Sequence, residues 1–298
     1  MKFFQHFALG MRSYWKAIGF IKTHKLYWYL PIPAVLMLLI YYVGSKFVNW
    51  QADWSAEEGC LACSNMNETI WFLLKMLLSI SIGLVLMKFA KYIVVVLLSP
   101  MLSIISQIVE KKLTSNKYPF SLQQTLHDVK RGLRIAMRNV MWEYVFFLII
   151  IIVSALGWDE MHKSPVFYLT FAIGFFYYGF SFIDYVNERR RLDIDQSIHF
   201  IRRHRGLAVA IGSVYSIFIL VPVDLGEMVN FKGFLDHPFQ TLGTVLFQFL
   251  LWMLASIAPI LTIVAATIAM DDLVDLSKNQ YADKDEIFIK TSPSVDNE

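Results

Sequence analysis

The chain has 298 residues, of which 56% are hydrophobic and only 17% are charged, and its formal net charge is +3. A soluble domain would have roughly 45–50% apolar and about 25% charged residues. The apolar residues are also gathered in long blocks, so the composition argues against a soluble protein and predicts an all-α integral membrane protein surrounded by the lipid bilayer. We expect no nucleic-acid partner.

Basic residues alternate with basic-poor segments along the chain. Lys and Arg number five in 1–25, none in 49–69, seven in 110–138, one in 157–165, six in 187–205, one in 224–241 and three from residue 271 onward. Under the positive-inside rule the basic segments face the cytoplasm. This pattern predicts a multi-pass protein of the cytoplasmic (inner) membrane with both termini on the cytoplasmic side.

The first predicted element is an amphipathic helix over residues 3–22. Its apolar side chains recur at steps of three and four, as the series Phe4, Phe7, Met11, Trp15, Ile18 and Ile21. Such a helix can lie along the membrane surface, or it can pack on the core of the protein itself. The periodicity favours the membrane surface and leaves the second arrangement open.

Two long spanning helices are predicted next. Leu26–Val48 contains Pro31 and Pro33 near its start and is long enough to cross the bilayer. After an outward loop, Ile70–Leu98 forms a stretch longer than the bilayer requires, so it must tilt or project beyond it. That loop carries a lone Cys60-x-x-Cys63 pair, which lacks the second ligand pair of a zinc site and is expected to be functionless or to close the loop.

The rest of the chain is predicted to form shorter helices. Ser99-Pro100 ends the second span, and the blocks that follow are Met101–Lys112, Ser121–Arg138 running into Val140–Leu156, Val166–Ile183, Leu207–Val223 and Leu242–Met270. Three of these apolar blocks have only 17 or 18 residues, the lower limit for a crossing. They are therefore either short spans or hairpins that dip partway into the bilayer, and three helical hairpins are predicted in both cases.

Domain organisation is expected to be simple. Residues 1–270 should form a single membrane-embedded helical domain. Residues 271–298 are polar and acidic and contain a Ser-Pro-Ser stretch, which is typical of a partly disordered cytoplasmic tail.

Signatures of catalysis are missing from the sequence. There is no P-loop, no G-x-S-x-G, no H-E-x-x-H and no G-x-G-x-x-G, and the seven histidines are scattered without metal-ligand spacing. We therefore expect no enzyme activity, no catalytic residue, no metal site and no cofactor.

Several passages carry a family resemblance. An apolar run meets Ser99-Pro100 and leads through an amphipathic helix to Val109-Glu110. Later, Phe182-Ile183-Asp184-Tyr185 closes an apolar helix, Arg202-Arg203-His204-Arg205-Gly206-Leu207 opens the next, and Ala258-Pro259 lies in the last. Their order and spacing resemble the CysZ sulfate permeases and the related eukaryotic etoposide-induced membrane proteins. The positions that carry the resemblance are Pro100, Glu110, Asp184, Arg202, Arg203 and Pro259.

The resemblance implies a transporter or channel for an inorganic oxyanion, sulfate above all, that works as a homo-oligomer. It also implies an oxyanion site just before the first span, where the family carries a Pro-Gly-Leu/Ile-Arg turn. The aligned residues here are Lys22, Thr23, His24 and Lys25. A helix start with free N–H groups, a hydroxyl and cationic side chains would suit a sulfate-like anion.

Two departures from the family pattern keep other interpretations open. The glycine of the turn is lost, and Lys25 stands at the position of its arginine. A lysine cannot bind an oxyanion in the bidentate way that an arginine can. Roughly 25–30 additional residues also lengthen the segment before Ala258-Pro259. Lys22–Lys25 could instead anchor the helix at lipid headgroups, and the protein could be a non-transporting scaffold or assembly protein of the same family. The sequence shows no pair of opposite charges deep in a span, which also favours the scaffold. Glu143 is the closest candidate for such a buried charge.

Overall fold

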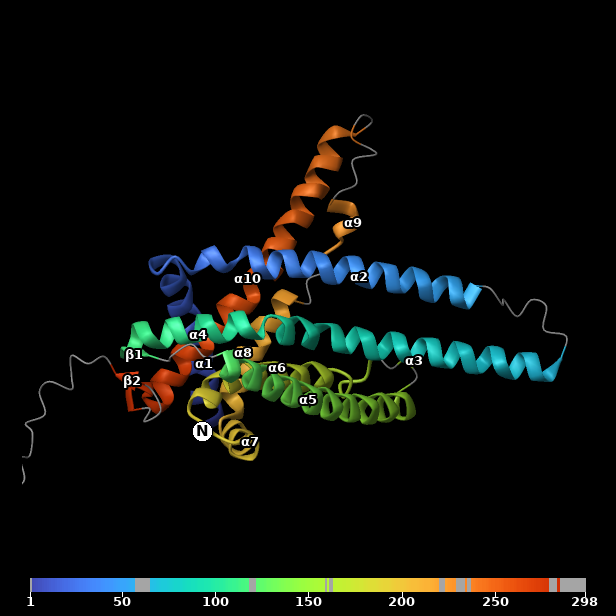
Figure 1. Cartoon of the computed structure of the whole chain (residues 1–298). Coiled ribbons are helices and arrows are strands. Elements are labelled where there is room, and N and C mark those ends of the chain that lie inside the picture. The colour runs from blue at the N-terminus through green and yellow to red at the C-terminus, as the bar shows by residue number, and fades with distance from the viewer. Residues whose placement is uncertain are drawn as a thin grey trace, which may run out of the picture. The chain divides into compact units, whose positions relative to one another are not determined.

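The computed structural model is almost entirely helical (Figure 1). It describes residues 2–56, 65–117, 122–158, 160, 163–219, 223–228, 234, 237–278 and 283–284. The predicted cysteine pair, Cys60 and Cys63, and residues 285–298 of the predicted tail lie outside these described residues.

The elements follow one another with short connections. In chain order they are α1 (Lys2–Thr23), the 3₁₀ turn η1 (Leu26–Tyr29), α2 (Pro31–Ala56), α3 (Met66–Leu97), α4 (Ser99–Thr114), β1 (Asn116–Lys117), α5 (Leu122–Gly157), α6 (Leu169–Arg189), α7 (Ile194–Arg203), α8 (Arg205–Ile219), α9 (Leu225–Met228), α10 (Pro238–Val274), the 3₁₀ turn η4 (Leu276–Lys278) and β2 (Asp283–Lys284). The two-residue strands pair antiparallel, with Asn116 opposite Lys284. The prediction of an all-α membrane protein is confirmed.

Membrane-spanning capacity was searched only in the described part of the chain. Four segments there are long and apolar enough to cross a bilayer: Leu26–Gly44, Lys130–Gly157, Leu169–Arg189 and Pro238–Val274. By contrast, α8 has 15 residues. At 1.5 Å per residue it is about 22 Å long, short of a hydrocarbon core of roughly 30 Å. The length of α8 therefore suits a helix that dips partway into the bilayer, which stays a prediction.

Prolines lie at the starts of two helices and inside a third. Within the predicted first span, helix α2 begins at Pro31, because Leu26–Tyr29 form the 3₁₀ turn η1 and proline favours the first helical turn. Pro100 likewise lies in the first turn of α4, so this helix begins two residues earlier than predicted. Pro259 lies inside α10, where it has no N–H to donate to the carbonyl of Ala255.

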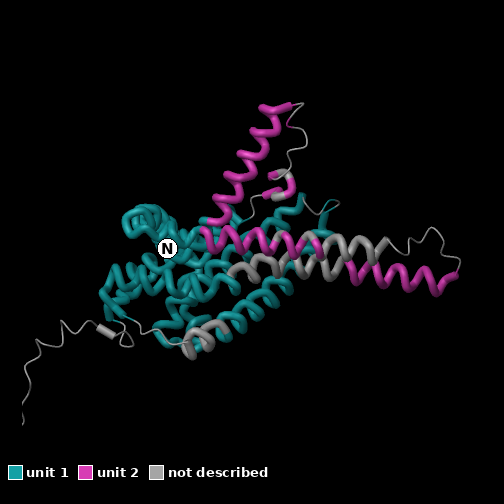
Figure 2. The backbone as a smooth tube through the Cα atoms, turned by 45° about the horizontal axis from the view of Figure 1, so that its top comes forward, with its two compact units in different colours: residues 1–30, 96–221, 257–298 teal, residues 31–95, 222–256 magenta. Residues whose placement is uncertain are grey.

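By internal contacts the chain divides into two compact units (Figure 2). Unit 1 comprises residues 1–30, 96–221 and 257–298, and unit 2 comprises residues 31–95 and 222–256. The sequence predicted one membrane-embedded domain over residues 1–270. The division in α10 falls between Ser256 and Ile257, next to the proline that weakens the helix.

Unit 2 contains α2, most of α3, α9 and the first half of α10. Many of its large apolar side chains are exposed, among them Leu73, Leu77, Leu246 and Leu250. A water-soluble surface would not tolerate so many exposed apolar side chains, whereas lipid tails solvate them. This exposure is a consequence of the apolar composition that predicted a membrane protein.

Unit 1 is built on close helix crossings at glycine. A Cβ atom on Gly179 of α6 would lie 1.8 Å from the carbonyl oxygen of Ala208 in α8, and one on Gly212 of α8 would lie 1.7 Å from that of Phe175 in α6. Only glycine permits such an approach of two backbones, a common way for membrane helices to pack. The crossing buries aromatic side chains beside it, since Phe182 and Tyr215 are fully buried with ring centroids 4.8 Å apart.

The first helix joins this core along one face. Gly10, Tyr14 and Ala17 are buried, and the Tyr14 hydroxyl donates a hydrogen bond of 2.6 Å to the carbonyl oxygen of Ile211 in α8. Phe4 and Trp15 on another face remain 77% and 78% exposed. The structure therefore shows that α1 packs on the core of the protein through its face of small residues, as the second alternative predicted. Contact of the apolar face with the membrane surface stays a prediction.

The predicted tail begins as ordered structure. Instead of ending at Met270, α10 continues to Val274, and η4 follows with Leu276 buried. The exposed Lys16 of α1 forms an ion pair of 2.6 Å with Asp272. The first residues after Met270 thus pack within unit 1.

Candidate functional site

The predicted oxyanion-binding residues lie at the C-terminal end of α1. The Thr23 hydroxyl donates to the carbonyl oxygen of Gly19 at 3.0 Å, and the His24 ring Nδ1 lies 3.1 Å from that of Phe20. Lys25 has a left-handed backbone with φ 55° and precedes only the four-residue turn η1. The expected helix start is therefore absent at Lys22–Lys25, where the local helix dipole favours cations instead of anions. Anion binding by these four residues stays a prediction, and it would have to come from their side chains, without the free N–H groups of a helix start.

Two of the family-motif residues form buried charge clusters. Glu110 of α4 is fully buried, and the Nε of Arg189, the last residue of α6, donates to its Oε2 at 2.8 Å. The Nη2 of Arg189 donates to the Ser106 hydroxyl at 2.8 Å, and this hydroxyl lies 2.6 Å from that of Thr267 in α10. The cluster therefore ties α4, α6 and α10 together.

The amide of Asn116 completes this cluster. Its Nδ2 donates to Glu110 Oε1 at 3.1 Å and to the carbonyl oxygen of Leu276 at 2.8 Å. Both carboxylate oxygens of Glu110 thus accept hydrogen bonds, which offsets the cost of removing the charge from water. The same amide holds η4 against the end of α4.

Asp184 of α6 forms the second cluster. Its Oδ1 is 3.1 Å from Nη2 of Arg131 in α5 and accepts a 2.5 Å hydrogen bond from Ser197 of α7. The Nη1 of Arg131 donates to the carbonyl oxygen of Leu192, and the amide of Asn187 donates to Ser197. This network fixes the connection between α6 and α7. Sequence reasoning named Glu110 and Asp184 but missed the arginine partners, which lie 79 and 53 residues away.

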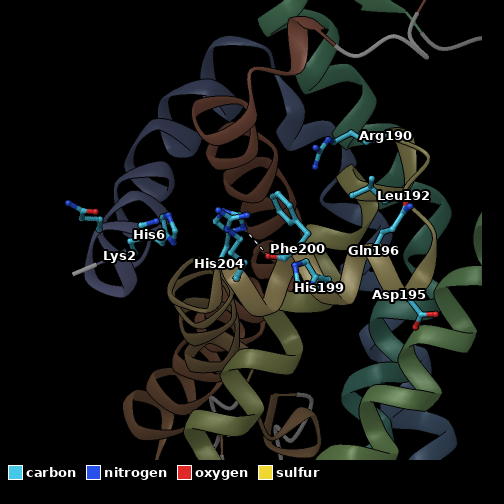
Figure 3. A pocket seen from close by; sticks show the side chains of 11 residues that line it. Lys2, His6, Arg190, Leu192, Asp195, Gln196, His199, Phe200 and His204 are labelled. Carbon is cyan, nitrogen blue, oxygen red and sulfur yellow. Dashed lines mark hydrogen bonds between the residues drawn. The ribbon is translucent and has the colours of Figure 1, made fainter.

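A groove of about 820 Å³ opens beside the α7–α8 junction (Figure 3). It lies between the first two turns of α1, the end of α6, and α7. Its lining residues are Lys2, Gln5, His6, Arg190, Leu192, Asp195, Gln196, His199, Phe200, Arg203 and His204. Three are permanent cations, three are histidines and one is a carboxylate, so the groove is electropositive. Of these residues, only Arg203 was predicted as a site residue.

The two ends of the groove differ. His6 of α1 and His204 lie with ring centroids 4.8 Å apart, next to Lys2 (Figure 3). On the other side of the His204 ring lies Phe200, at 4.4 Å between centroids, and the Arg190 guanidinium lies 5.1 Å from the Phe200 ring centroid and donates to Asn187 Oδ1 at 3.2 Å. Arg190 is thus already engaged, and burial lowers its pKa. The free donors are therefore expected at the His6 end.

Burial lowers the pKa of both histidines. For His6 the second cause is the charge of Lys2. For His204, hydrogen bonding to the Phe200 carbonyl opposes the shift, while His6, Arg203 and Arg190 add to it. A field of neighbouring cations that disfavours a further proton also attracts an anion. Asp195 is the acidic side chain of this lining, and Figure 3 shows it at the end opposite Lys2 and His6.

Arg202 and Arg203, adjacent in sequence, differ in their surroundings. Arg203 lines the groove, and within the described structure its side chain has neither a hydrogen bond nor an ion pair. Arg202 is exposed and does not line the groove; its carbonyl oxygen accepts a hydrogen bond from Nε of Arg205. In the described ranges, no group of three or more His, Cys, Asp or Glu side chains could hold a metal ion.

The fold and the site together define a class of protein: a helical membrane protein with buried charge clusters and an electropositive groove. The sequence model of the family described as "Sulfate transporter CysZ/Etoposide-induced protein 2.4" matches residues 13–224, from α1 to the residue before α9. The chain therefore belongs to this family, as the resemblance predicted. No curated protein and no solved structure matches the chain.

Proposed function

We propose that the protein moves an inorganic oxyanion, sulfate in the first instance, across the cytoplasmic membrane as a homo-oligomer and without enzymatic chemistry. Sulfate comes from the family description, and the residues supply a chemistry that suits an anion. The basic segments face the cytoplasm in this proposal, because Lys and Arg collect in alternate loops.

The observation that carries the proposal is the surplus of cations between α6 and α8. Residues 187–205 contain six arginines against three acidic residues. Arg189 is neutralised by Glu110 inside the protein, whereas Arg203 opens onto the groove without a partner among the described residues. Such a surface would concentrate anions at the ends of the helices. Oligomers are supported by α8, which at 15 residues is too short to build a pore wall alone.

Labelled-sulfate uptake into proteoliposomes tests the proposal. Saturable uptake above that of empty liposomes is expected, with competition by phosphate and weaker competition by chloride. Lys25→Ala tests the predicted residues Lys22–Lys25, and Lys278→Ala serves as the control, because Lys278 is 81% exposed and pairs only locally with Asp275. Uptake that falls with Lys25→Ala alone would place a transport residue at the end of α1.

The second candidate is a non-transporting scaffold of the same family. The observation that favours it is the helix C-terminus at Lys22–Lys25, where the resemblance implied a helix start. Protein that is folded and reconstituted but gives no flux above empty liposomes would reject transport and support the scaffold. In that case Lys22–Lys25 would be headgroup anchors.

A further inference from the structure

The electropositive groove is a binding site that lies away from the predicted one. We propose that it binds a tetrahedral oxyanion, either free sulfate or phosphate or the phosphate of a lipid headgroup, between Lys2, His6, Arg203 and His204. The site joins the start of α1 to the end of α7, two elements that are about 200 residues apart in sequence.

The charges of the lining support an anionic ligand. Lys2 and Arg203 have no ion-pair partner in the part of the chain that the structure describes, and both are exposed. Arginine offers a planar fork that matches an oxyanion, and lysine adds a point charge. Cationic side chains that are not neutralised in a concave site attract an anion more strongly than the same side chains on a flat surface.

Hydrogen-bond geometry selects which imidazole nitrogen faces the ligand. The His204 Nδ1 lies 2.8 Å from the Phe200 carbonyl oxygen and donates to it, so Nε2 is left for the groove. A protonated His204 can donate from Nε2 to an oxyanion while keeping the Phe200 bond. The His6 ring lies 4.8 Å from the same ring, with the two planes tilted by 53°, and brings a second imidazole from α1.

The size of the groove makes two sources of the ligand reasonable. A volume of about 820 Å³ is far larger than one bare sulfate ion. A free ion would therefore keep part of its water shell, whereas a headgroup phosphate would bring glycerol and acyl atoms into the space. Both present the same tetrahedral oxygens to Arg203 and Lys2.

The proposed site is physically separate from Lys22–Lys25. His6 and Lys22 are 16 residues apart on the same helix, which is about 24 Å at 1.5 Å per residue. One ion cannot contact both ends of α1. Variants at the two ends therefore report on different sites.

Calorimetric titration of sulfate and of inorganic phosphate into the purified full-length protein in a zwitterionic detergent tests the site. Arg203→Ala should weaken sulfate binding about tenfold or more, because a charge-assisted contact is lost. Arg202→Ala is the matched control: it removes the same charge one residue away, outside the groove, and should change the affinity less than about twofold. Lys2→Ala, at the exposed start of α1, should lower the affinity in the same direction as Arg203→Ala.

A second arm distinguishes the two sources of the oxyanion. The protein is placed in nanodiscs of phosphatidylcholine alone or with phosphatidylglycerol. If the anionic headgroup occupies the groove, sulfate binding disappears only with phosphatidylglycerol and bound phosphatidylglycerol decreases with Arg203→Ala. If the ligand is a free ion, sulfate binds equally in both nanodiscs. Either result supports the site when Arg203→Ala weakens the binding and Arg202→Ala does not.

Equal effects of Arg203→Ala and Arg202→Ala on sulfate and phosphatidylglycerol binding would overturn the inference, as would binding of neither ligand to the folded protein. The inference shares only the class of ligand with the proposed function, and binding is measured without flux. Binding that depends on Arg203 but comes without uptake would therefore reject transport and keep the site, whereas uptake without any Arg203-dependent binding would keep transport and reject the site.

Discussion

Two arginines that lie 14 residues apart, Arg189 and Arg203, have opposite environments. The side chain of Arg189 is 7% exposed, and its Nε, Nη1 and Nη2 all donate, to Glu110, the Tyr185 carbonyl and Ser106. Arg203 is exposed on the groove and has no such partner within the described ranges. In sequence both belong to one basic stretch.

The comparison separates structural from ligand-directed charge. A buried guanidinium whose three nitrogens all donate inside the protein cannot turn to an ion without breaking those hydrogen bonds. A guanidinium without partners in an open groove costs little to engage. Charge counting treats the two alike, whereas the hydrogen bonds of each side chain distinguish them.

Removing the carboxylate that neutralises Arg189 should have the largest effect. Glu110→Ala leaves the buried arginine charge uncompensated, so we expect a loss of about 3–5 kcal/mol in the free energy of unfolding. Lys16→Ala breaks an ion pair of 2.6 Å that is exposed, and it should cost about 0–1 kcal/mol. Denaturant titration in detergent measures both; equal losses would mean that the buried cluster has no special structural role.

The docking of α1 on α8 links the core to the groove and gives the next largest effect. A Cβ on Gly10 would lie 2.6 Å from the Cβ of Ala210, whereas one on Gly19 would meet nothing within 4 Å. Gly10→Ala should therefore destabilise by about 1–3 kcal/mol. Gly19→Ala should be neutral or stabilise by up to about 1 kcal/mol, because alanine is the better helix former.

Sulfate titration of the same two variants sharpens the result. Lys2 and His6 are carried by α1, so Gly10→Ala should also weaken sulfate binding, while Gly19→Ala leaves it unchanged. Unchanged binding with Gly10→Ala would separate the groove from the helix crossing.

The sequence was sufficient to predict the helices because their signals are local. Long apolar blocks and Pro31 and Pro100 near helix starts predicted a helical membrane protein, and most predicted blocks coincide with helices of the structure. Helix ends were less predictable. Lys22–Lys25 read as the start of a span because the apolar run begins at Leu26, but a left-handed residue and a 3₁₀ turn separate the two helices there.

The groove could not be predicted, because its parts meet only in the folded chain. Nothing in the local pattern relates Lys2 and His6 to Arg203 and His204. The buried clusters were also hidden, since Glu110 and Arg189 are 79 residues apart. The sequence does carry a signal for the contact between α1 and α8. Gly10, Ala17 and Gly206 are small residues on the faces at which these two helices approach closely.

The cap of α7 should have a smaller effect. Asp193 accepts a hydrogen bond of 2.7 Å from the Gln196 N–H, and the Gln196 side chain accepts one from the Asp193 N–H, which makes a capping box. Asp193→Ala should cost about 1 kcal/mol of stability. Asp195→Ala, two residues on, leaves the cap intact and removes the carboxylate of the groove, so sulfate affinity should rise. If Asp195→Ala instead weakened sulfate binding, the electrostatic account of the groove would be wrong.

The smallest expected effect is the pH dependence that the groove histidines impose on stability. The pKa values of His6 and His204 are lowered in the folded protein, chiefly by burial. Below a pH of about 6.5 the unfolded chain therefore binds more protons than the folded one, and stability falls as the pH falls through this range. Bound sulfate should reduce the loss, because a dianion beside the two rings favours their protonated forms.

Melting temperatures between pH 7.5 and 5.5, with and without sulfate, measure this effect. The double variant His6→Gln/His204→Gln should flatten the pH dependence and remove the part that sulfate restores. His237→Gln, outside the groove, should leave both unchanged. A pH dependence that survives in the double variant would assign the titration to other groups. The groove would then differ from the buried clusters by the unpaired arginine alone, and its histidines would have no part in the pH dependence.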